Sequence, residues 1–134
     1  LLITARDDPD ATTQLAKIAR THFPNLRIIS RARDMRHLFE LRDAGVHMIE
    51  RETWLGALRL GEQAVTEVSG DAARARRMAE TFAEHDVEVL TKLYEVHRTQ
   101  PDAHVTVSNE LRDQLARTLD EDERRIALAK PESS

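Results

Sequence analysis

The stretch LRIISRARDMRHLFELRD at residues 26–43 decides the fold. Its first part, residues 26–32, is rich in β-branched and apolar side chains, which is typical of a short buried strand. Asp34 stands directly before a run of apolar residues at helical spacing, and aspartate is a favoured helix N-cap. This stretch therefore predicts a strand that is followed at once by a helix.

The same order of elements occurs on both sides of this stretch. Residues 1–4 are apolar and predict a strand, and Asp8 can then cap a helix. Gly45 can end the helix of the central stretch in the left-handed conformation, and residues 46–49 predict a third strand. A third helix follows at residues 54–68. Strands that alternate with helices indicate parallel pairing, so this part of the chain is predicted to be α/β.

The pattern changes after residue 70, where apolar side chains recur at helical spacing over residues 75–96. Pro101 and Asp102 predict a break, and a last helix with a leucine stripe is expected after it. Its apolar positions are Leu111, Leu115, Leu119 and Ile126. The one strand-like run in this half is Val105-Thr106-Val107. The sequence thus predicts two parts, an α/β layer at 1–70 and a helical extension with an acidic tail at 71–134.

Composition excludes several classes of function. The chain has 134 residues, no cysteine and a net charge of −4, which excludes a disulfide framework and disfavours a nucleic-acid binder. No run approaches the roughly 18 apolar residues of a membrane span, and a cytoplasmic setting fits. The six histidines form no i, i+4 pair, so no metal site is predicted. No Ser/His/Asp constellation is recognisable, and the protein is not expected to be an enzyme.

Two features predict self-association. A three-stranded sheet that opens at residue 1 leaves an uncovered edge, and such edges pair with other chains. The edge either pairs with another chain or lacks a partner that a longer polypeptide supplies. The stripe Phe82, Val89 and Leu93 either packs onto the α/β layer or forms a dimer.

Five short motifs occur in order along the α/β part. They are Asp7-Asp8-Pro9, His22-Phe23-Pro24, Arg31-Ala32-Arg33-Asp34, Ala44-Gly45-Val46 and Arg51-Glu52-Thr53. In type and spacing they resemble the cytosolic nucleotide-binding regulatory domain (the RCK or KTN type) of Kef-type, glutathione-gated bacterial potassium efflux systems. The resemblance covers residues 1–97, and residues 98–134 look like a variable tail without a family motif.

The resemblance implies a fold and a function. The chain would be the second half of a Rossmann-like domain, with three parallel strands and their helices, followed by two long helices. It would sense a ligand and gate potassium–proton antiport through a homodimer, on the cytoplasmic face of the inner membrane. The implied partners are a membrane antiporter domain in the same polypeptide and an ancillary oxidoreductase.

The resemblance also implies cofactors. The full domain of the family binds NAD(H) or AMP, with a Gly-rich turn that cradles the phosphates. The four glycines of this chain form no such turn, so the chain alone is expected to bind no nucleotide, or to bind it weakly.

Two positions of the chain correspond to the family's glutathione site, and one of them departs from its pattern. Arg51 corresponds to an arginine that contacts glutathione between subunits, and a guanidinium suits a peptide carboxylate. From the residues alone, Arg51 could instead pair with Glu50 or Glu52. Asp86 stands where glutathione-gated members carry asparagine. Ionised aspartate only accepts hydrogen bonds and repels an anion, and its alternative role is a solvated residue or the partner of an arginine.

The nucleotide residues are expected at the ends of the first two strands. Ala5, Arg6 and Asp7 follow the first strand, and Arg31 and Arg33 end the second, where ligands bind in doubly wound sheets. The alternatives are turn and capping chemistry for the aspartate and ordinary surface positions for the arginines. A stand-alone helical interaction module without a small-molecule ligand is the competing function, and an NAD(H)-dependent enzyme is disfavoured because the phosphate-binding half is missing.

Overall fold

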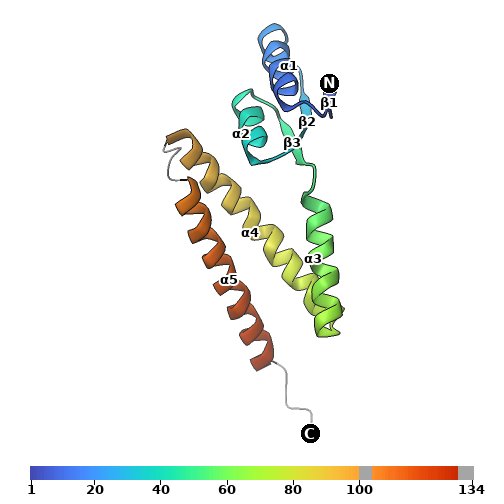
Figure 1. Cartoon of the computed structure of the whole chain (residues 1–134), viewed down its shortest axis with the longest axis vertical. Helices are drawn as coiled ribbons and strands as arrows, with labels where there is room; N and C mark the ends of the chain where they lie inside the picture. The colour runs from blue at the N-terminus through green and yellow to red at the C-terminus, as the bar shows by residue number, and fades with distance from the viewer. Residues whose placement is uncertain (100–103, 130–134) are drawn as a thin grey trace. The chain divides into compact units, whose positions relative to one another are not determined.

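The computed structural model describes residues 1–99 and 104–129. Its elements, in chain order, are β1 (Leu2–Thr4), α1 (Pro9–His22), β2 (Ile28–Ala32), α2 (Met35–Asp43), β3 (Met48–Arg51), α3 (Trp54–Ser69), α4 (Ala72–Thr99) and α5 (His104–Ala129) (Figure 1). The chain divides into two compact units, Leu1–Ala57 and Leu58–Ser134.

The sheet of the first unit is parallel and has the order β1-β2-β3. In its register Ile3 lies beside Ile29, and Ile29 lies beside Met48. Each strand is followed by a helix, and the predicted α/β fold with two long helices after it is confirmed. The strand order places β2 in the middle and leaves β1 and β3 at the two edges.

Both predicted aspartate caps are present. The Asp8 carboxylate accepts the N–H of Ala11 at 3.0 Å, and the Asp34 carboxylate accepts the N–H of His37 at 2.8 Å. Pro9 opens α1, where its missing N–H would have had no partner in any case. Each cap therefore fixes the point at which the chain leaves a strand and enters a helix.

The end of α2 explains why β3 begins later than predicted. Gly45 has a φ of 75°, and the N–H of Val46 donates to the carbonyl of Leu41 at 3.0 Å. The N–H of Gly45 donates to Arg42 at 2.9 Å, which completes a Schellman motif. Val46 thus belongs to the helix end rather than to the strand, and β3 runs from Met48 to Arg51 instead of 46–49.

The core of the first unit lies on one face of the sheet. Ile28, Ser30 and Ala32 of β2 are buried there beneath α1 and α2, which pack against each other. On the other face, Ile3 is 66% exposed and Met48 is 49% exposed. The alternation along β2 therefore separates a covered face from an open one.

The second unit contains a helical hairpin in which α4 and α5 run side by side in opposite directions (Figure 1). Leu93 of α4 and Leu111 of α5 are buried. The stripe Phe82, Val89 and Leu93 therefore packs against α5, a partner that neither sequence interpretation named. The backbone at Val105-Thr106-Val107 is helical, so the strand-like interpretation of this run is wrong.

The predicted break at Pro101 and Asp102 lies outside the described residues. No helix within residues 1–99 and 104–129 combines the length and the apolar character needed to cross a membrane.

One ion pair joins the two helices of the hairpin. Arg74 donates to Glu123 from Nε at 3.0 Å and from Nη2 at 2.5 Å. This hydrogen bonding, with the attraction between the two charges, raises the pKa of Arg74 above its ordinary value. The contact with Glu123 therefore favours the charged form of Arg74.

Arg20 joins three segments at the edge of the sheet where the strands begin. Its guanidinium donates to the carbonyls of Pro24 at 2.5 Å and Gly45 at 2.6 Å, and it contacts Nδ1 of His47 at 3.2 Å. The same Nδ1 accepts the N–H of Ile28 at 3.2 Å. One side chain of α1 thus holds the turns that precede β2 and β3.

We expect Arg20→Met to lower the free energy of unfolding by about 2–3 kcal/mol, because the carbonyls of Pro24 and Gly45 lose a charged donor. Urea unfolding measures this difference. Lys17→Met, at an exposed position of the same helix, is the control and should stay within about 0.5 kcal/mol of the unsubstituted protein. Equal losses for the two variants would contradict the role given to Arg20.

Candidate ligand-binding site

The carboxyl ends of the three strands meet at one edge of the sheet, because all the strands are parallel. The loop at residues 5–8 follows β1, Arg33 follows β2, and Glu52 follows β3. The N–H of Glu52 donates to the carbonyl of Ala32 at 2.9 Å, which extends the pairing of β2 and β3 into this edge. In open α/β sheets this is the edge at which ligands bind.

Arg31 is the centre of the charges at this edge. Its Nη2 lies 2.8 Å from the Asp7 carboxylate, and its Nε lies 3.8 Å from Glu52. The Asp7 side chain is 98% exposed, whereas the Arg31 side chain is 31% exposed. Arg31 therefore links the loop after β1 to the end of β3, and its charge faces two carboxylates.

Arg33 has a different role from Arg31. Its Nη1 donates to the backbone carbonyl of Asp7 at 3.3 Å, and the residue is exposed. Among the described residues no carboxylate lies within ion-pair distance of the Arg33 guanidinium. The structure thus brings together Asp7, Arg31 and Arg33 as the sequence suggests. Ala5 and Arg6 lie in the same loop and are exposed.

His37 positions this edge, and the sequence analysis missed it. The residue is 1% exposed, and its Nδ1 accepts the N–H of Arg33 at 3.1 Å. The backbone N–H of His37 donates to the Asp34 carboxylate, so the two residues close the turn from both sides. The available signal was a histidine three residues after an N-cap, where a Glu or Gln side chain can reach back in a capping box.

Arg51 lies over the Trp54 ring, with Cζ 3.9 Å from the ring centroid. A guanidinium over an indole face is a cation–π contact, and it fixes the direction of the Arg51 side chain. Both residues belong to the first unit, where β3 ends and α3 begins. The stacking on Trp54 thereby holds the planar guanidinium in one orientation.

Asp86 belongs to the second unit and lies between α4 and α5. It is half-buried and lines a groove of about 200 Å³. The other lining residues are Phe82, His85 and Val89 of α4 and Leu111, Arg112 and Leu115 of α5. Asp86 is therefore not a solvated residue of an open helix face, because α5 lies alongside it.

Comparison with known proteins shows similarity along most of the chain. Residues 56–133 match the family model described as the potassium efflux system KefB C-terminal domain. This match includes residues 98–133, a segment in which the sequence analysis found no family motif.

Curated relatives are similar over different lengths. A glutathione-regulated potassium-efflux system protein KefC from Enterobacter sp. (strain 638) is 37% identical over 128 residues, 96% of this chain and 21% of that protein. The protein of the same name from Cronobacter sakazakii is 44% identical over 95 residues, 71% of this chain and 15% of that protein. The chain thus spans about a fifth of the length of these relatives, or less.

A solved structure has the same fold. The Shewanella denitrificans Kef CTD in AMP bound form has a TM-score of 0.66 and 34% sequence identity to this chain. The match covers 71% of this chain and 60% of that one.

Proposed function

Because the chain belongs to the family of potassium efflux system KefB C-terminal domains, we propose that it is a ligand-sensing module that gates potassium efflux through a dimer. A bound metabolite would favour one arrangement of the dimer over another and so shift the population of the open transporter. The transported ions would be potassium and, in exchange, protons. The membrane antiporter domain would lie in the same polypeptide, with this module on the cytoplasmic face and an ancillary oxidoreductase as a further partner.

The observation that carries the proposal is the charged strand edge. Arg31, Arg33 and Asp7 lie together where an open α/β sheet takes a ligand, and the similar Kef structure contains AMP. The exposed Arg33 guanidinium fits a phosphate group, since no carboxylate of the described residues occupies it. The chain has no Gly-rich turn to complete a nucleotide site, so AMP or NAD(H) would need a further segment for tight binding.

The contacts at this edge support different roles for Arg31 and Arg33. Arg33 would contact the phosphate of AMP, whereas Arg31 would hold the loop and β3 in place through Asp7 and Glu52. Calorimetry with AMP and adenosine, on the full-length protein that carries this chain, separates these roles. We expect Arg33→Gln to remove most of the preference for AMP over adenosine, about tenfold for one charged hydrogen bond.

Arg31→Gln is the matched variant and should weaken binding of AMP and adenosine to a similar degree. Equal AMP-to-adenosine ratios in the unsubstituted protein and in Arg33→Gln would show that Arg33 does not meet the phosphate. Absence of AMP binding to the unsubstituted protein would remove the nucleotide part of the proposal.

A second ligand, glutathione, would use Arg51 and Asp86. The orientation of Arg51 on Trp54 supports a role in carboxylate recognition, and Asp86 lines a groove that also contains Arg112. The curated relatives are named as glutathione-regulated. A carboxylate at position 86 would keep the affinity for anionic glutathione low.

Exposed apolar side chains on α3 support the homodimer. No residue of this helix is buried, and Leu55, Leu60 and Val68 are 68%, 68% and 90% exposed. A second copy of the chain is the partner we propose for this surface. The same exposure also favours the competing function, a helical interaction module without a small-molecule ligand, and the AMP titration distinguishes the two.

A further inference from the structure

The Asp86 face of α4 is covered by another part of the chain. Leu111 of α5 is 6% exposed, and His85, next to Asp86, lies with its Nε2 3.4 Å from the Leu111 carbonyl oxygen. Leu93 continues the buried stripe and is 3% exposed. Asp86 is therefore part of the seam between two helices rather than of an open surface.

The space left beside Asp86 is small. The groove measures about 200 Å³, whereas sites for small organic molecules measure about 300–1,000 Å³. A tripeptide-sized ligand that contacts Asp86 would meet Leu111 and Leu115 of α5 in its way. The closed hairpin therefore leaves little room for such a ligand beside Asp86.

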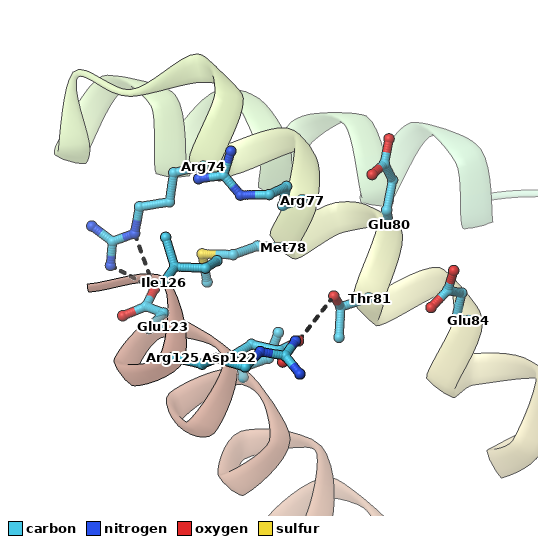
Figure 2. Close-up of a pocket in the computed structure, with 11 residues that line it drawn as sticks. Arg74, Arg77, Met78, Glu80, Thr81, Glu84, Asp122, Glu123, Arg125 and Ile126 are labelled. Atoms are coloured by element: carbon cyan, nitrogen blue, oxygen red, sulfur yellow. Dashed lines mark hydrogen bonds and ion pairs between the residues drawn. The ribbon is translucent and has the colours of Figure 1, made fainter. Parts of the chain in front are cut away.

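The far end of the hairpin is held by charges (Figure 2). Arg74 of α4 reaches Glu123 of α5, and the Thr81 hydroxyl donates to Asp122 at 3.5 Å. Met78 and Ile126 lie between these contacts and line a pocket of about 210 Å³. The Arg74 and Glu123 side chains are 43% and 35% exposed, so water and salt screen their attraction.

Charge placement favours the closed hairpin over separate helices. Basic residues gather at the N-terminal end of α4, and acidic residues gather near the C-terminal end of α5. Within either helix alone, these like charges repel one another. The antiparallel arrangement brings the two groups together, and Arg74 and Glu123 form the contact between them.

We propose that α5 is a strap over the Asp86 face of α4 and that the contact between Arg74 and Glu123 holds it closed. The helix α5 must then move aside before a ligand can reach Asp86. This inference rests on the proposed glutathione function. It adds a conformational step, because ligand binding at Asp86 then competes with hairpin closure. The apparent affinity equals the intrinsic affinity multiplied by the fraction of molecules in which α5 is open.

Loosening the strap tests the inference. We would measure glutathione binding by calorimetry, and hydrogen exchange along α5, in the full-length protein that carries this chain. Glu123→Gln removes the negative charge that attracts Arg74 and so weakens the closed hairpin. We expect it to tighten glutathione binding about two- to fivefold. Glu121→Gln makes the same charge change at an exposed position of the same helix and should leave the affinity unchanged.

Two further results belong to the same experiment. Exchanging the charges, with Arg74→Glu and Glu123→Arg together, should return the affinity to that of the unsubstituted protein. Glutathione should speed hydrogen exchange at residues 111–123, because the bound ligand holds the strap open.

The outcomes separate this inference from the proposed function. If glutathione binds equally well to the unsubstituted protein and to Glu123→Gln, and hydrogen exchange along α5 is unchanged or slower, the strap proposal is wrong. The proposed glutathione function is not affected by that result. If no variant binds glutathione, even where hydrogen exchange shows that α5 is open, both the strap proposal and the proposed glutathione function are wrong.

Discussion

Asp86→Asn is expected to raise the affinity for glutathione tenfold or more. The substitution removes a negative charge that repels the ligand carboxylates, and it supplies an amide donor where aspartate has none. A charged hydrogen bond contributes about 1.5–3 kcal/mol, and 1.4 kcal/mol corresponds to a factor of ten in the dissociation constant. Arg112 lines the same groove, and its charge then faces the ligand without Asp86 beside it.

Calorimetry on the full-length protein that carries this chain measures this change, with Asp113→Asn on the exposed surface of α5 as the control. Arg51→Ala, added to the Asp86→Asn variant, should abolish the gain because the oriented guanidinium is lost. An unchanged affinity in Asp86→Asn, together with no effect of Arg51→Ala, would show that these residues do not form a glutathione site. The interaction-module function would then be the better account.

The local signals predicted the local structure well. Asp8, Asp34 and Gly45 each act through neighbours within a few residues, so the chemistry that caps or ends a helix is present in the sequence itself. The start of β3 was wrong by two residues, since Val46 serves the end of α2. β-branched residues at 105–107 indicated a strand, but β propensity depends on context and the backbone there is helical.

The candidate site was only partly predictable. The types and spacing of Asp7, Arg31 and Arg33 indicated one sheet edge, yet which arginine meets the carboxylate depends on the strand register. The contact of His37 with the Arg33 N–H depends on burial, and the position of His37 three residues after the Asp34 cap was the signal that the sequence analysis did not use. The cover over Asp86 was missed because α5 lies beyond the last recognised motif, and only the folded hairpin brings it alongside α4.

Potassium release from vesicles is the most direct test of the account. The full-length protein that carries this chain would be reconstituted, and release would be followed while glutathione is titrated. We expect the release rate to change on the order of tenfold, within the range of typical allosteric couplings. Asp86→Asn should respond at about a tenth of the glutathione concentration, and Arg51→Ala should not respond, whereas Arg59→Ala at an exposed position of α3 should respond normally. A release rate that stays the same at every glutathione concentration in all four proteins would contradict the proposal that this chain senses a ligand to gate potassium efflux.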